Sequence, residues 1–510
     1  MSNHFKKPGL HLGMYVSDKH SRYQNQYKSN DYFWGIGIEN ETYLQFSISN
    51  TMSAKDIYEK HTQERYSINY FSGLNPEYKN LLKKLYPVSN SAQVLAVMKS
   101  SDSETQQMYD IPCFINAHTL QKTDISGNHE TTYEKEPKPN PNFKGQSIHD
   151  VLCLTFPQYF KNRYKVNYMY DGDTIEFMTQ NFYKTTVKTN IEELLKEKAL
   201  YLKAINKAFK KNNIFQRKGE LSYPTRNEPF VSFMTNPRNI TTFNNGTYHF
   251  NFTLPTQLNS AKKPVNQKQF VDQHKAAIRY IQYLEPLLIA MYGTPDPFSQ
   301  VSDKYSAASQ RCAVSRYIGI GTYNTNIMLT GKVLAIDVEQ ALGFKKDFWW
   351  YTNYTKDSHY TPLPRIGVDI NFNKHGTHGI EIRFLDWFPE DQLSPLMNFF
   401  VHVLDFSLLH GLPPDPTICP IWNGLVVRML KTGKPLELTD EEYEMYSTIF
   451  KIQSKTILSQ LNCCIKSDEN EVKTIPVVYR ILTEHLNKVK GICCKYMIGE
   501  IEKTISCVSI

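Results

Sequence analysis

A strand with two different faces is encoded by the stretch GIGIENETYLQF, residues 35–46. Side chains alternate along a strand, so one face carries the glycines and the carboxylates: Gly35, Gly37, Glu39 and Glu41. The other face is apolar. Two carboxylates side by side repel each other unless a cation lies between them, and such a pair is typical of a divalent-metal site. A strand that shows acidic residues to water is the alternative interpretation.

The stretch TYHFNFTL, residues 247–254, has the same two-faced pattern. His249, Asn251 and Thr253 share one face, and the residues between them are aromatic or aliphatic. The amide and hydroxyl groups are neutral hydrogen-bonding groups that suit a nucleotide phosphate or ribose. A purely structural histidine is the alternative for His249.

Two further stretches place charged residues on a strand face. GIEIRFLD, residues 379–386, presents Glu381 and Arg383 together, with Ile380 and Ile382 on the opposite face. DTIEFMT, residues 173–179, offers Glu176 after a turn. An ordinary ion pair between Glu381 and Arg383 is the alternative to a functional role.

Arginines at positions 311 and 316 are candidates for contacts with an anion. A spacing of five suits a loop that wraps a phosphate better than one face of a helix. Neither a G-x-x-x-x-G-K-[ST] loop nor a well-placed G-x-G-x-x-G is present. Bound phosphates would therefore be held by metal ions and by Arg311 and Arg316.

The overall pattern predicts an α+β fold. Six strand-like stretches, which we assign to one sheet, cover residues 34–46, 164–179, 230–236, 247–254, 366–372 and 379–386. Long helices are predicted at 191–211, with Asn190 as N-cap, and at 267–291. The connections between strands do not fix their order.

The length of 510 residues predicts more than one unit. We assign residues 1–410 to a catalytic domain, in which 121–146 is a surface insertion with little apolar periodicity. After the sequence GLPPDP at 411–416 the pattern changes to helices, including 440–461 and one near 490–506. Residues 411–510 are therefore predicted to form a helical C-terminal region.

Composition excludes several classes of protein. The net charge of +8 is spread over the whole chain, which argues against nucleic-acid binding, and the lysines of 203–211 are interpreted as the solvated face of a helix. Apolar runs are too short for a membrane span, and no signal peptide is evident, so a cytoplasmic protein is expected. The vicinal pairs Cys463–Cys464 and Cys493–Cys494 are expected to be reduced thiols; a zinc site is the alternative.

Taken in order, these motifs resemble the glutamine synthetase and glutamate–cysteine ligase superfamily. The resemblance is carried by G-x-E-x-E at 37–41, G-x-x-H-x-N-x-T at 246–253, the two arginines five apart, and E-x-R at 381–383. DGDTIEF at 171–177 and the closing E-x-R-F-x-D are similar to the amidoligase branch known from fungi and viruses. The strand reads H-x-N where glutamine synthetase has H-x-H.

This resemblance implies a curved, largely antiparallel sheet with a polar concave face, helices on its other face, and an ATP- and Mg²⁺- or Mn²⁺-dependent ligase. Such an enzyme joins a carboxylate (of an amino acid, peptide or protein) to an amine through an acyl phosphate. It also implies residue roles. One metal ion on the nucleotide phosphates would be held by Glu39, His249 and Glu381, and a second, nearer the substrate, by Glu41 and Glu176. Arg311 and Arg316 would contact the transferred phosphate, and Arg383 the substrate carboxylate or the acyl phosphate.

Two other functions stay open. A phosphotransferase of the guanidino-kinase type shares the fold, although its reactive cysteine and arginine cluster are not evident. A catalytically silent scaffold would bind a partner through the helical C-terminal region. Retention of all the polar strand positions favours the ligase.

Overall fold

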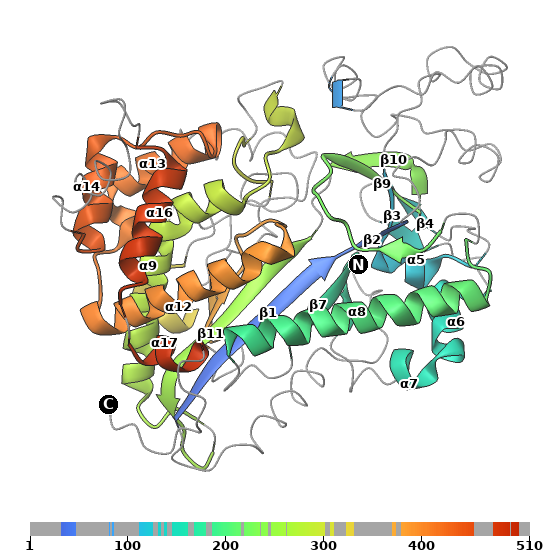
Figure 1. Ribbon diagram of the computed structural model, residues 1–510, viewed down its shortest axis with the longest axis horizontal. Coiled ribbons are helices and arrows are strands. Elements are labelled where there is room, and N and C mark those ends of the chain that lie inside the picture. The colour runs from blue at the N-terminus through green and yellow to red at the C-terminus, as the bar shows by residue number, and fades with distance from the viewer. Residues whose placement is uncertain are drawn as a thin grey trace.

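The computed structural model describes residues 32–46, 81, 84–85, 112–125, 131–133, 137–139, 145–161, 168–179, 186–215, 219–234, 236–242, 246–261, 263–300, 306–310, 323–330, 370–373, 379–452, 473–489 and 491–498. Their main feature is an antiparallel sheet of six strands in the order β12-β13-β11-β1-β7-β6 (Figure 1). The strands are β1 (Tyr32–Thr42), β6 (Tyr168–Asp171), β7 (Thr174–Met178), β11 (Thr247–Gln257), β12 (Ile370–Phe372) and β13 (Ile380–Ile382).

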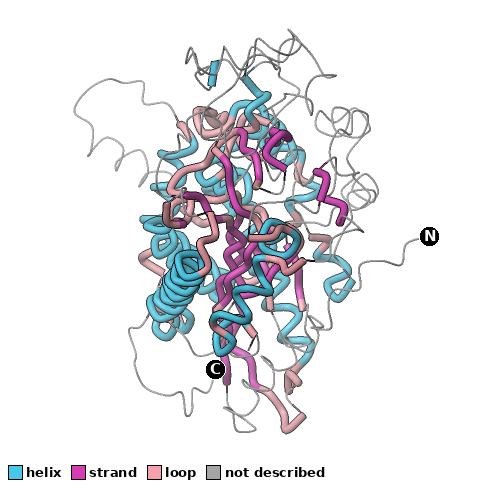
Figure 2. The backbone as a smooth tube through the Cα atoms, turned by 90° about the vertical axis from the view of Figure 1, so that its right-hand side faces the viewer, coloured by secondary structure: helices cyan, strands magenta, loops and turns pink. Residues whose placement is uncertain are grey.

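Two helices cover the apolar face of this sheet, α8 (Val187–Lys211) and α12 (Leu393–His410). Phe400 of α12 lies with its ring centroid 5.6 Å from Phe250 of β11, and Tyr201 of α8 lies 5.2 Å from Phe177 of β7. Figure 2 shows α8 nearly end-on beside the layer of strands. Burial of these alternating aromatic and aliphatic side chains supplies the main stabilisation of the sheet. The predicted α+β class, with helices on one face of a largely antiparallel sheet, is confirmed.

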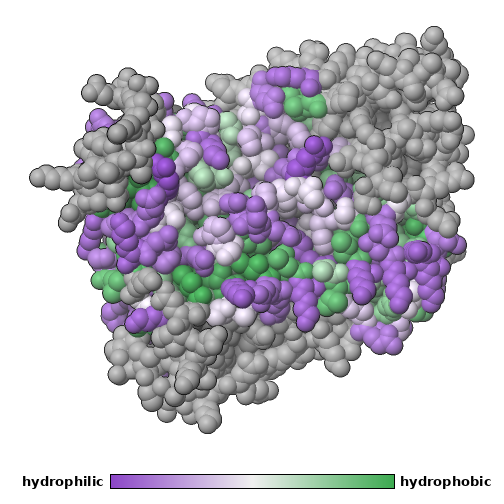
Figure 3. Space-filling model, viewed as in Figure 1, coloured by the Kyte–Doolittle hydropathy of each residue, from purple (hydrophilic) through white to green (hydrophobic). Residues whose placement is uncertain are grey.

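The helix predicted at 191–211 begins four residues earlier than expected. Thr186 is its N-cap and accepts a hydrogen bond from the Thr189 N–H, so the prediction of Asn190 as N-cap is wrong. Asn190 is instead buried in the first turns and donates its amide to the Ile36 carbonyl, 2.9 Å away. It therefore joins α8 to the apolar face of β1. The predicted solvated face is confirmed: the lysines within 203–211 are exposed, and this side of α8 is hydrophilic in Figure 3.

A second sheet has five strands in the order β10-β9-β3-β2-β8. It contains β2 (Leu44–Phe46), β3 (Cys113–Ile115), β8 (Leu221–Ser222), β9 (Phe230–Phe233) and β10 (Asn236–Thr242). Assigning residues 230–236 and all of 34–46 to one sheet was therefore wrong. The chain of β1 passes through Tyr43 directly into β2, and alternation of side chains alone does not show where a strand changes partners.

The segment 121–146 is only partly described. Its first residues complete the short helix α5 (Ala117–Lys122), in which Leu120 is buried, and a two-stranded hairpin follows, β4 (Thr131–Tyr133) with β5 (Pro137–Pro139). The short helices α6 (Ile148–Thr155) and α7 (Pro157–Phe160) come next. The beginning of the predicted insertion is thus regular and packed.

The C-terminal region is helical, as predicted, and packs on α9 (Gln267–Tyr292) and α12. It contains α13 (Pro420–Thr432), α14 (Asp440–Ile449), α16 (Ile475–Leu486) and α17 (Ile492–Met497). Short 3₁₀ turns, η4 (Pro297–Gln300), η5 (Thr325–Thr330), η8 (Glu390–Gln392) and η9 (Pro416–Ile418), lie in the connections. The Trp422 indole donates to the Gln282 carbonyl, 3.0 Å away, and one hydrophobic core extends across the predicted boundary at Gly411.

Two predicted helix ends differ from the structure. The helix expected at 440–461 ends at Ile449, because Lys451 has φ of 52°, which a helix does not accommodate. The helix expected near 490–506 is α17, and the residues after 498 lie outside the described part. None of the described helices combines the length and the apolarity needed to cross a bilayer.

Candidate metal centre

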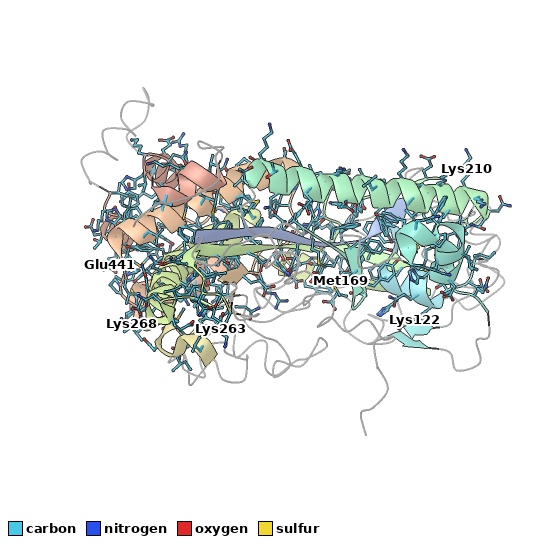
Figure 4. The ribbon with its side chains drawn as sticks, turned by 90° about the horizontal axis from the view of Figure 1, so that it is seen from below. Lys122, Met169, Lys210, Lys263, Lys268 and Glu441 are labelled. Atoms are coloured by element: carbon cyan, nitrogen blue, oxygen red, sulfur yellow. The ribbon has the colours of Figure 1, made fainter. Side chains whose placement is uncertain are left out.

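The face of the six-stranded sheet opposite α8 is lined by polar side chains, which the antiparallel register brings into rows (Figure 4). Glu39 of β1 stands opposite His249 of β11. In the next row Glu381 of β13 stands between Asn251 of β11 and Asn371 of β12. Side chains directly opposite each other on neighbouring strands are about 5 Å apart at Cβ, so the two rows form one continuous polar surface.

A third row pairs Glu41 of β1 with Glu176 of β7, whose other neighbour is Met169 of β6. Figure 4 shows Met169 on the side of the sheet opposite α8, which identifies the face that these carboxylates share. Like charges directly opposite each other on a sheet are destabilising. Glu41 and Glu176, which are predicted to share a metal ion, are such direct cross-strand neighbours.

Two glycines allow the strands to approach closely at this site. Gly246, with φ of 108°, comes just before β11, and a Cβ there would lie 1.6 Å from the Glu41 carbonyl oxygen. A Cβ at Gly379 would lie 2.1 Å from the Phe252 carbonyl oxygen. Any side chain at these positions would displace a neighbouring strand. The glycines that begin the G-x-x-H and G-x-E-x-R motifs thus set the positions of His249 and Glu381.

The strongest candidate for a metal site is formed by Glu39, His249 and Glu381. Among the described residues these three offer one ligand atom each, and the three atoms lie within 4.8 Å of one another. The Nδ1 atom of His249 is 3.2 Å from Oε2 of Glu39 and 3.9 Å from Oε1 of Glu381. The Nε2 atom of the same ring is 3.9 Å from Oε1 of Glu41. Both nitrogens of one imidazole therefore face carboxylates.

These side chains are largely removed from solvent. His249 is 2% exposed and Glu381 3%, and the side chains of Glu39 and Glu41 are 14% and 12% exposed. Buried carboxylates at such short range are costly unless a cation neutralises them. Carboxylate oxygens are ligands for Mg²⁺ and Mn²⁺, and an imidazole nitrogen is a ligand for divalent transition-metal ions. The donor set is able to hold a divalent metal ion, and the predicted Mg²⁺ or Mn²⁺ stays a prediction.

Arg383 and Asp386 flank the site at the end of β13. The Arg383 Nε atom lies 3.8 Å from Oε1 of Glu381, and the Arg383 side chain is 25% exposed. Asp386 is buried and accepts hydrogen bonds from the Thr294 N–H and the Ser309 hydroxyl, both at 2.7 Å. The last residue of E-x-R-F-x-D therefore fixes the segment 306–310, which leads to Arg311.

The other predicted site residues have different positions. Asn251 donates its amide to Oε1 of Glu39, 3.3 Å away. Thr253 is buried, and its hydroxyl accepts a hydrogen bond from the Gly379 N–H at 2.9 Å, so this hydroxyl holds β13 in place. Arg311 and Arg316 lie outside the described residues. Their predicted contacts with a phosphate stay predictions.

Asn371 is part of the site and was missed in the sequence. Its amide donates to Oε2 of Glu381 at 2.6 Å. The signal was available, since Asn371 lies between the apolar Ile370 and Phe372 and shares the alternation of the other polar strands. Its partner depends on the register between β12 and β13, which the alternation of side chains does not contain.

Comparison with known proteins finds a viral relative. The chain is 39% identical over 432 residues to the uncharacterized protein R704 of Acanthamoeba polyphaga mimivirus, which corresponds to 84% of this chain and 72% of the viral protein. This chain and R704 belong to one family. No protein-family model matches the sequence.

Membership of this family establishes relationship over most of the chain and assigns no activity. The argument for function therefore depends on the site itself. The site consists of carboxylates and one imidazole on the polar face of an antiparallel sheet, with an arginine at its edge.

Proposed function

We propose that this protein is an ATP- and divalent-metal-dependent carboxylate–amine ligase of the glutamine synthetase-like type. The observation that carries the proposal is the convergence of Glu39, His249 and Glu381 from three adjacent antiparallel strands. The Glu41–Glu176 pair in the neighbouring row supports it. This arrangement agrees with the metal sites that the sequence resemblance implies.

In this reaction a substrate carboxylate oxygen attacks the γ-phosphorus of ATP, and ADP leaves. The amine then attacks the acyl phosphate carbon, inorganic phosphate leaves, and the nitrogen loses a proton. A divalent ion at such a site neutralises charge on the phosphates. Glu39, His249 and Glu381 would hold that ion, and Glu41 and Glu176 a second one closer to the substrate.

Arg383 would bind the substrate carboxylate or the acyl phosphate. It lies beyond Glu381 on the same edge of the site, and about 7 Å of strand separates two residues that share a face. A planar guanidinium can contact two oxygens of a carboxylate or phosphate at once. Its Nε atom lies 3.8 Å from Oε1 of Glu381, so the guanidinium would contact a carboxylate or phosphate oxygen that lies next to the triad.

The test is incubation of the protein with Mg²⁺ or Mn²⁺, ATP and pools of amino acids, polyamines and peptides. Mass spectrometry should find a product lighter by one water than its combined reactants, with one ADP and one phosphate released per product. A phosphorylated product without free phosphate would instead identify a phosphotransferase. Absence of any ATP turnover would favour the scaffold.

A double variant tests the site assignment. Glu39→Gln with Glu41→Gln should abolish ADP release while leaving the fold intact, because both side chains lie on the polar face and neither is part of the hydrophobic core. Glu192→Gln on the exposed side of α8 is the matched control and should behave as wild type. Undiminished ADP release from the double variant would contradict the metal assignment.

A further inference from the structure

Each of the two carboxylates of the triad, Glu39 and Glu381, accepts a hydrogen bond from an asparagine on an adjacent strand. Asn251 of β11 donates to Glu39 of β1 at 3.3 Å, and Asn371 of β12 donates to Glu381 of β13 at 2.6 Å. Both asparagines belong to the row that contains Glu381. They approach the triad from the same side of His249.

Because of these hydrogen bonds, the two oxygens of each carboxylate have different partners. In Glu39 the amide binds Oε1, while Oε2 lies 3.2 Å from Nδ1 of His249. In Glu381 the amide binds Oε2, while Oε1 lies 3.9 Å from the same Nδ1. One oxygen of each carboxylate is therefore held by an amide, and the other is directed to the centre of the triad.

An amide N–H suits this purpose because it donates to a carboxylate without adding charge. A cationic donor on the outer oxygen would add to the positive charge that Arg383 already places 3.8 Å from Oε1 of Glu381, whereas a neutral donor satisfies one oxygen and adds no charge. Hydrogen bonds to the outer oxygen also fix the rotation of the carboxylate. The amides act on geometry without reducing the charge of the site.

We propose that Asn251 and Asn371 are positioning residues that determine which oxygen of Glu39 and of Glu381 binds the divalent ion. Asn251 would then act on a metal ligand, and not on the nucleotide as its sequence pattern suggested. The inference rests on the metal site of the proposed function. It does not depend on which reaction the site catalyses.

The experiment measures Mn²⁺ binding to the full chain by titration calorimetry, without nucleotide, and the urea unfolding midpoint of each metal-free protein. Asn371→Leu and Asn251→Leu remove the donor at similar volume. Removal of a residue that hydrogen-bonds to a metal ligand typically weakens metal binding about 10- to 100-fold, and we expect the Kd for Mn²⁺ to rise by a factor in this range for both variants. Asn371→Ser, which keeps a shorter donor, should show a smaller loss.

Asn190→Leu is the matched control, because Asn190 is also a buried asparagine that bonds β1, but from the opposite face of the sheet. It should lower the unfolding midpoint and leave the Kd for Mn²⁺ unchanged. A merely structural role for Asn251 and Asn371 would give the same result as this control.

Folded leucine variants with the wild-type Kd for Mn²⁺ would overturn the proposal. If Asn371→Leu does not fold, Asn251→Leu decides, since Asn251 is only half-buried. Wild-type protein that binds no Mn²⁺ would overturn both the site and this inference. Weakened Mn²⁺ binding in the variants, together with no ligation product from wild type, would remove the ligase proposal and leave the positioning role intact.

Discussion

Replacing Glu381 by glutamine should remove most of the stabilisation that a metal ion gives to this protein. The substitution keeps the shape of the buried side chain and removes one negative charge from a triad whose ligand atoms lie within 4.8 Å. Stabilisation by a bound ion follows from its affinity for the folded state. It amounts to about 2.7 kcal/mol when the free ion is present at about one hundred times its Kd.

If the substitution weakens the affinity about 30- to 100-fold, the same ion concentration stabilises the variant by only about 0.4 to 0.9 kcal/mol. The metal-free proteins should differ much less. At 4.8 Å, the upper limit of the distances between these ligand atoms, the repulsion between two carboxylates is about 3.5 kcal/mol for an effective dielectric constant of about 20. Its relief is offset by loss of the attraction between Glu381 and Arg383, whose Nε atom is 3.8 Å away.

The assay is urea unfolding of wild type and of Glu381→Gln, each with and without Mn²⁺, monitored by circular dichroism. Glu192→Gln, exposed on α8, serves as the control and should keep the full metal-dependent increase in unfolding free energy. An equal increase in wild type and Glu381→Gln would refute the assignment of Glu381 as a metal ligand. A large loss of stability in the metal-free variant would show that its carboxylate has a structural role.

Three further predictions concern other residues. Arg383→Lys should lower turnover and leave nucleotide affinity near wild type; normal kinetics with a lower melting temperature would indicate a structural ion pair. Burial lowers the pKa of His274 to about 4, whereas a histidine in the unfolded chain binds a proton near pH 6.5. Between about pH 6.5 and about pH 4 only the unfolded state is therefore protonated at this residue. The unfolding free energy should fall as the pH drops through this range, by up to about 1.4 kcal/mol per pH unit. Urea midpoints across this range should show a shallower slope for His274→Gln, and equal slopes would contradict the reasoning. Asp405→Ala removes the carboxylate that accepts hydrogen bonds from the Cys493 and Cys494 N–H groups at 2.7 Å. The substitution should lower the unfolding free energy by about 1–3 kcal/mol and speed labelling of the Cys493 and Cys494 thiols. Labelling at the wild-type rate would contradict a stabilising role for Asp405.

The polar strand faces could be predicted from the sequence because each strand alternates strictly. Alternation and residue chemistry select Glu39, His249 and Glu381 as polar strand positions, the resemblance to the glutamine synthetase-like ligases groups them as one metal site, and the structure brings them together. The pairing of Glu41 with Glu176 needed the register between β1 and β7, which alternation does not contain. Which strands are neighbours, and hence which side chains meet, is determined by tertiary packing.

The mistaken assignments have the same origin. Asn190 is a residue type that favours the N-cap position, but its amide donates to the Ile36 carbonyl across the helix–sheet interface. Thr186 caps the helix instead. Asn371 has no charge and little sequence context, so only its contact with Glu381 reveals its place. Local propensity describes what a residue can do, and the partner that the fold supplies decides what it does.

The alternation along β1 has a consequence for how this protein can change during evolution. The same eleven residues supply ligand candidates from one face and core side chains such as Ile36 and Ile38 from the other. Insertion or deletion of a single codon within this strand would exchange the two faces beyond that point, moving carboxylates into the core and aliphatic side chains onto the polar surface. Loss of function and loss of folding would then arrive in one mutational step, so length variation among relatives should avoid β1 and accumulate between the strands.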